Sequence, residues 1–168
     1  ILIWFVKQIE HFVCRVLPEK GTDENLPRLK YISAGLLSTA ELSLLEARKE
    51  IALMGQRCQR AFDLVVSMHG IEKDDDFNAI FKKVEKYEGI TDNMEYEIAH
   101  YLQQVADGHI SDEAKRQIQR MLREVDDLES VGDCCYNLAR TLSRKRTKCK
   151  EHFTQEQMIH ISEMEQLV

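Results

Sequence analysis

Residues 111–148 of this 168-residue chain read SDEAKRQIQRMLREVDDLESVGDCCYNLARTLSRKRTK. Apolar side chains recur through this stretch at steps of three and four, which is the spacing of a helix with one buried face. The stripe consists of Ala114, Ile118, Leu122, Val125, Leu128, Val131, Cys135, Leu138 and Leu142. Ser111 offers an N-cap before the stripe, and the basic residues 144–148 complement the helix dipole after it. The stretch therefore predicts one long amphipathic helix.

Two stripes of the same period precede this one. The first predicts a helix from about residue 29 to residue 68, ended at Gly70. The second begins at three aspartates, residues 74–76, which offer N-cap oxygens and favourable charge, and it ends near Gly108. Helices joined by loops this short pack as antiparallel neighbours. The expected fold class is therefore all-α, a three-helix antiparallel bundle.

The rest of the chain divides into shorter segments. Residues 1–16 begin with six apolar side chains and predict an apolar helix, either the end of a membrane helix or a terminus docked on the bundle. Residues 17–28 hold both prolines of the chain and predict a linker to the bundle at residues 29–150. Residues 151–168 contain the capping box TQEQ at positions 154–157 and predict a further helix, the start of a truncated second bundle. The bundle is thus expected to carry a partial helix at each end.

Composition and motifs exclude several functions. The chain has 23 Lys and Arg against 29 Asp and Glu, a net charge of -6, so nucleic acid is not an expected partner. Five cysteines without a CxxC pair fit neither a disulfide framework nor a zinc finger, and they favour a reducing compartment. The isolated glycines form no phosphate-binding loop, and the GxSxG and HExxH motifs are missing.

The most informative polar pattern is a pair of acidic steps on the second and third helices. Glu88 precedes Asp92 by four residues, and Glu129 precedes Asp133 by four, so each pair lies on one helix face. Antiparallel packing would bring the two pairs together. Two carboxylates 4 Å apart repel by about 4 kcal/mol at an effective dielectric near 20, so a packed cluster needs a multivalent cation, shared protons or open solvent. All-oxygen ligation suits Mg²⁺, Ca²⁺, Mn²⁺ or iron. The alternative is a solvated face on which nearby Lys or Arg offsets each acid.

Three segments resemble the signatures of PhoU domains. Residues 88–92 read EGITD, and they resemble the family's first signature, a Glu and an Asp four residues apart. Residues 127–133 read DLESVGD and resemble the second, which is followed by a helix bearing an Asn, here Asn137. Residues 50–54 (EIALM) match the family's Glu-plus-Met pattern in the first helix. Ser130 departs from the family, which usually has Arg at this position, and the missing cation changes the charge balance of the site.

The resemblance implies a three-helix bundle with a multinuclear iron or zinc site at Glu88, Asp92, Glu129 and Asp133. Together with the apolar start, it also implies a likeness to the cytoplasmic C-terminal region of bacterial sodium/phosphate cotransporter-related proteins. The expected function is a non-enzymatic regulatory domain on the cytoplasmic side of the inner membrane. It would bind a metal and contact the membrane part of a phosphate transporter. The unpaired apolar segments also predict a homo-oligomer.

Two other functions remain open from the residues. One is a di-metal carboxylate enzyme, which would need Glu-x-x-His steps on two helices. The bundle has one such step, Glu97 and His100, and no second copy. The other is a helical adaptor that binds no metal.

Overall fold

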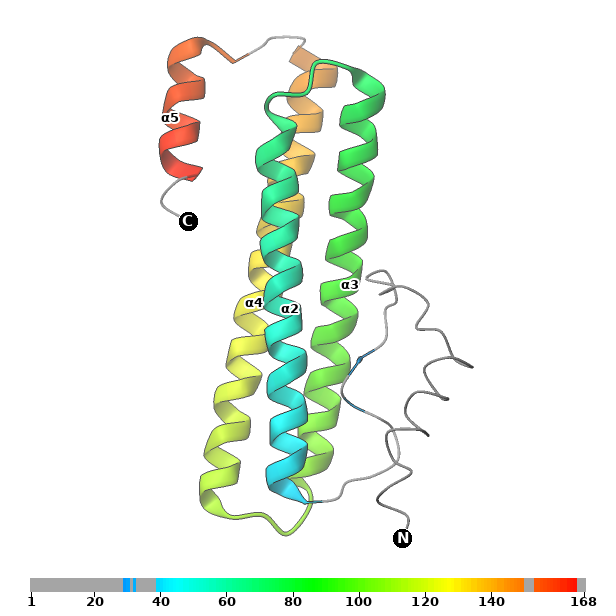
Figure 1. Cartoon of the computed structure of the whole chain (residues 1–168), viewed down its shortest axis with the longest axis vertical. Coiled ribbons are helices and arrows are strands. Elements are labelled where there is room, and N and C mark those ends of the chain that lie inside the picture. Colours follow the sequence, from blue (N-terminus) through cyan, green and yellow to red (C-terminus); the bar gives the residue numbers. More distant parts are fainter. Residues whose placement is uncertain (1–28, 31, 33–38, 150–152, 166–168) are drawn as a thin grey trace, which may run out of the picture.

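The computed structural model describes residues 29–30, 32, 39–149 and 153–165. In this part of the chain 87% of the residues are helical and there is no strand. The elements are α2 (Ala40–Met68), α3 (Asp74–Ala106), α4 (Asp112–Arg144), the π-helical turn η2 (Lys145–Cys149) and α5 (Gln155–Glu165). The three long helices pack against one another side by side with alternating direction, and the short α5 is set apart from them (Figure 1). The expected all-α, antiparallel three-helix bundle is confirmed.

The segments expected at residues 1–16 and 17–28 lie outside the described residues. Among the described helices, none is both long enough and apolar enough to span a bilayer. The expected helix in residues 151–168 is present as α5. Its capping box forms as the sequence predicts: the Thr154 backbone N–H donates to Gln157 Oε1 at 3.0 Å, and the Gln157 N–H donates to Thr154 Oγ1 at 3.3 Å.

Two helix starts differ from the expectation. The first helix was expected from about residue 29, but α2 begins at Ala40, because Thr39 is extended (φ -146, ψ 154) and its side chain accepts from the Leu42 N–H. The second helix is capped by Lys73, without a side-chain hydrogen bond. The three aspartates that follow occupy the first turn of α3, where their charge still complements the helix dipole.

The start of α4 and the end of α2 lie where the sequence predicts them. Ser111 caps α4, accepting the Ala114 N–H at 3.2 Å, as predicted. Gly70 ends α2 without the left-handed backbone that a terminal glycine often adopts. Instead the His69 N–H bonds to the Val66 carbonyl and closes the last turn.

The apolar stripes meet along the bundle axis in two core clusters. The larger one is centred on Met54, Met94, Ile98 and Val125, and the smaller one on Val65, Phe77, Val84 and Ala139. Two members of the predicted third stripe lie outside the core, however. Val131 is 47% exposed and Leu138 is 51% exposed, because they sit on the edge of α4 rather than on its buried face. That edge is therefore an apolar surface of the bundle.

The buried cysteines belong to the smaller core and to its border. Burial, and then the nearby Cys135, raise the pKa of Cys58 to about 11, so its thiol stays protonated at neutral pH. The Cys58 Sγ–H donates to the Leu128 carbonyl oxygen at 3.2 Å. Among the described residues, Cys58, Cys134 and Cys135 are free thiols.

Candidate metal centre

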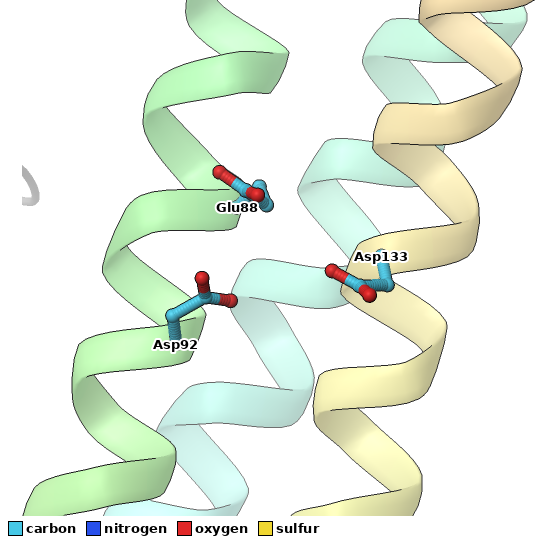
Figure 2. A group of neighbouring side chains, drawn as sticks. All are labelled: Glu88, Asp92 and Asp133. Carbon is cyan, nitrogen blue, oxygen red and sulfur yellow. The ribbon is translucent and has the colours of Figure 1, made fainter.

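Three carboxylates converge on the seam between α3 and α4. Glu88 and Asp92 project from successive turns of α3, and Asp133 projects toward them from α4 (Figure 2). One oxygen of each side chain lies within 4.8 Å of one oxygen of the other two. Divalent cations bind carboxylate oxygens at about 2.0–2.6 Å, so oxygens on opposite sides of one ion are about 4–5 Å apart. The three side chains therefore fit around a single small cation.

Glu129, the fourth residue predicted for the site, does not join this group. It lies one turn before Asp133 on α4, and the charges that act on it include Asp133, Glu95 and Asp92. Counting residues from the loop near Gly108 predicts that Asp92 and Glu129 lie within about 7.5 Å of each other along the bundle axis. The structure instead brings Asp92 opposite Asp133. Counting gives the height of a residue but not the rotation and tilt of its helix, which decide which carboxylates face each other.

α3 and α4 are in close contact directly beside the carboxylates. Thr91 precedes Asp92, Gly132 precedes Asp133, and these two residues touch across the two helices. Thr91 is 1% exposed, and its hydroxyl points back along α3 to the carbonyl oxygens of Tyr87 at 3.1 Å and Glu88 at 2.9 Å. A hydroxyl bonded to its own helix can lie in the apolar seam without an unsatisfied donor.

Glu88, Asp92 and Glu129 hold their protons more tightly than ordinary acids. Burial, and then Asp92 and Asp133, raise the pKa of Glu88 above its usual 4.5. Asp92 is exposed, yet partial loss of its water shell and the neighbouring Asp133 raise its pKa above 3.8. Burial, followed by Asp133 and Glu95, raises the pKa of Glu129 as well. Each shift has the direction expected for unneutralised negative charges held together.

No cation of the described residues neutralises the cluster. Neither Lys nor Arg forms an ion pair with any of the four acids in the described part of the chain, and none lowers the pKa values of Glu88, Asp92 or Glu129. Glu113 on the same helix shows the opposite case. There Arg116 and Arg120 bond to the carboxylate and lower its pKa. Within the described residues, the acids of the seam thus lack the ion pairs to Lys or Arg that would offset each of them on a solvated face.

The cluster is open to solvent on one side. Asp92 is exposed, while Glu88 and Asp133 are half-buried. Three carboxylates leave several positions of a six-coordinate ion to water or to an outside ligand. Neither His nor Cys belongs to the group, so the donors are all oxygen, the set that hard cations prefer.

The remaining residues singled out in the sequence lie elsewhere. Asn137 is exposed on α4, and it is not among the three convergent side chains. Glu50 is fully buried in α2, one turn before the buried Met54. His100, the candidate ligand of a di-metal enzyme, is exposed and stacks on Tyr96 with ring centroids 6.2 Å apart. The geometry therefore gives no support to the Glu-x-x-His arrangement.

A comparison with protein families shows to which family this chain is related. The family description "PhoU domain" matches residues 51–142, more than half of the chain, from the middle of α2 to the end of α4. The chain belongs to the PhoU family. The matched region of this PhoU domain includes both sides of the acidic seam. PhoU is a regulatory family of phosphate homeostasis and not an enzyme family. Comparison with curated proteins and with solved structures gave no match.

Proposed function

We propose that this PhoU domain regulates phosphate uptake and that a metal ion bound at Glu88, Asp92 and Asp133 is part of its regulatory state. The observation that carries the proposal is the convergence of three carboxylate oxygens from two helices within 4.8 Å, with no ion pair to a Lys or Arg of the described residues. Mutual repulsion makes this arrangement unfavourable in the empty protein, and a divalent or trivalent cation removes the repulsion. Glu129, one turn away, extends the acidic surface toward a second ion.

The chemistry of the donors narrows the class of metal. Carboxylate oxygens without nitrogen or sulfur donors favour Mg²⁺, Mn²⁺, Ca²⁺ or iron, and Zn²⁺ binds carboxylates as well. The partial exposure of the group gives an ion in solution a direct path to it. Among the described residues neither His nor Cys joins the group, so a role in binding and signalling suits the site better than a role in catalysis.

A thermal melting experiment tests the metal proposal. The purified protein is treated with a chelator and melted with and without Mg²⁺, Mn²⁺, Zn²⁺, Ca²⁺ or Fe²⁺. A bound ion at 100 times its Kd raises the free energy of unfolding by about 2.7 kcal/mol, roughly 5–10 °C for a chain of this size. Asp92→Asn combined with Asp133→Asn should abolish the shift.

Asp63→Asn with Asp127→Asn is the matched control, because it removes the same charge from exposed positions of α2 and α4. A wild-type protein whose melting temperature ignores all five ions would refute the metal site. A shift that survives in the Asp92 and Asp133 double variant would place the ion elsewhere.

The partner in this proposal is the membrane part of a phosphate transporter, in the same or another chain, at the cytoplasmic side of a bacterial inner membrane. Support comes from the family's role in phosphate homeostasis and from the apolar residues 1–6 of the sequence. Phosphate uptake by cells that carry the Asp92 and Asp133 double variant, compared with cells that carry the Asp63 and Asp127 control, tests the coupling. Equal uptake rates in the two strains would contradict it.

The proposal also includes association of this chain with copies of itself, as a homo-oligomer. An apolar groove of about 330 Å³ lies between α2, α4 and α5. Its lining includes Phe62, Val66 and Leu138 of the bundle and Ile161 and Met164 of α5. Exposed apolar surface of this kind is typical of protein interfaces.

A further inference from the structure

The two helices of the acidic seam are in close contact at the residues that precede its aspartates, Thr91 and Gly132. A Cβ added at Gly132 would lie 2.9 Å from Thr91 Oγ1, which is 0.5 Å closer than the 3.4 Å at which ordinary contact begins. The other helical glycines tolerate a Cβ. At Gly55 the nearest atom would be 3.7 Å away, and at Gly89 nothing lies within 4 Å. Gly132 is therefore the glycine, among those of the described helices, that the packing requires.

Thr91 cannot readily move out of the way. Its hydroxyl is bonded to the carbonyl oxygens of Tyr87 and Glu88, and the side chain is enclosed by the two helices. Rotation about χ1 would break these hydrogen bonds and would direct a methyl group or a hydrogen toward α4. A side chain at position 132 must therefore either break these hydrogen bonds or push α3 and α4 apart.

We propose that the contact between Thr91 and Gly132 sets the distance between the Asp92 and Asp133 carboxylates and thereby the affinity of the seam for a metal ion. The inference rests on the proposed metal site and adds two positioning residues that do not touch the ion. Aspartate has only two side-chain torsions, so Asp92 and Asp133 depend on the backbone spacing more than Glu88 does. The carboxylate oxygens of the group already lie up to 4.8 Å from one another. A wider spacing of α3 and α4 would move the Asp92 and Asp133 oxygens farther apart than the about 4–5 Å at which two oxygens can bind one ion.

The test compares single and double substitutions by Mn²⁺ titration calorimetry. Gly132→Ala should weaken Mn²⁺ binding at least 10-fold, the scale found when groups that orient metal ligands are removed. Thr91→Ala in the same chain should return the Kd to within about 3-fold of wild type, because the new Cβ then meets the Cβ of residue 91 at 3.6 Å, an ordinary contact.

Gly89→Ala is the matched control. It makes the same chemical change on α3 beside Glu88, where a Cβ meets no atom within 4 Å, so the Mn²⁺ affinity should stay within 2-fold of wild type. Melting temperature alone is not a sufficient readout, because Gly→Ala also stabilises a helix intrinsically. Wild-type affinity in Gly132→Ala, or a double variant as weak as the single one, would overturn the inference.

Crystal structures of the metal-free variants test the role of Thr91 and Gly132 independently of whether the protein binds a metal. Gly132→Ala should lengthen the distance between the Cα atoms of residues 92 and 133 by about 0.5 Å, and the double variant should restore it. If wild type binds no metal, the proposed function loses its ion, while the Cα distances still decide whether Thr91 and Gly132 set the spacing. An unchanged distance in Gly132→Ala would refute that role.

Discussion

Arg146 of η2 bonds to Asp74 in the first turn of α3, with Nε 2.6 Å from Oδ1, although 72 residues separate them in the chain. The same guanidinium donates to the carbonyl oxygens of Ile71 and Glu72 in the loop between α2 and α3. It also lies over the ring of Phe77, with Cζ 4.7 Å from the centroid. One side chain thus ties the end of α4 to the connection between the other two helices.

Arg146→Ala should lower the free energy of unfolding by roughly 2 kcal/mol, the loss of hydrogen bonds to a charged donor at a partly buried site. The expected drop in melting temperature is about 5 °C. Arg146→Lys should recover only part of this loss, because an ammonium group cannot reproduce the planar fork. Arg144→Ala, at an exposed position in the same basic run, is the control and should change the melting temperature by less than about 1 °C. Equal effects at positions 144 and 146 would contradict the role of Arg146.

Asp92→Asn should stabilise the metal-free protein at pH 7.5. Folding raises the pKa values of Asp92 and Glu88, so the protonated carboxyls favour the folded state. This contribution to the free energy of unfolding is complete below their ordinary pKa values of 3.8 and 4.5, and it is lost as the pH rises through the folded-state values. Removing the Asp92 charge should therefore add roughly 0.5 kcal/mol after solvent screening, or about 2 °C, at pH 7.5. The gain should disappear as the pH approaches 4. Chemical denaturation in the presence of a chelator measures it, with Asp127→Asn as control, and a gain independent of pH would argue against repulsion at the seam.

Ser130→Arg should weaken the response to metal. Residue 130 is exposed on α4 and precedes Asp133 by three residues, so a guanidinium there can reach the carboxylate from the same helix. The substitution should raise the melting temperature of the metal-free protein by about 1–2 °C and reduce the Mn²⁺ affinity several-fold. Ser130→Gln has a similar length without the charge and should do neither. If the Gln and Arg variants bind Mn²⁺ equally, charge at this position does not matter for the site.

Leu138→Glu should prevent self-association. The side chain is half-exposed at the edge of the apolar groove, so a charge there disturbs an interface more than it disturbs the bundle. Sedimentation velocity at micromolar concentration should show an oligomer for wild type and a monomer for the variant, with less than about 1 kcal/mol change in stability. Asn137→Glu, an exposed neighbour outside the groove, should leave the oligomer intact. A wild-type monomer would refute this interface.

The helices themselves are well determined by local sequence. The stripes of three and four residues predict α3 and α4 almost to their ends, because Ser111 and the residues near Gly108 act within one turn of the boundary. The apolar spacing predicts a start of α2 at residue 29, which is too early, although Leu29 and Ile32 do pack against the core. Apolar residues that contact a core from outside a helix cannot be distinguished from a helical stripe by spacing alone.

The site is less fully determined. Glu88, Asp92 and Asp133 follow from two acidic steps and antiparallel packing, but the separate place of Glu129 depends on helix rotation, which spacing along one helix does not contain. The role of Gly132 depends on an atom of another helix, Thr91 Oγ1. The same holds for Arg146, whose partners lie more than 70 residues earlier in the chain. Residue spacing in a single sequence does not predict such contacts between segments that are far apart in the chain.

No oxygen of the seam comes from α2: two of the three convergent carboxylates belong to α3 and one to α4. Each of these helices has 33 residues and is about 50 Å long, with the carboxylates far from the terminal loop at residues 107–111. The loop joins α3 and α4 at one end, so a change in their separation at the seam is small near the loop and grows toward the turn that holds Arg146. An ion at the seam of this PhoU domain would therefore have its largest effect at the end of the bundle where Arg146 contacts Asp74.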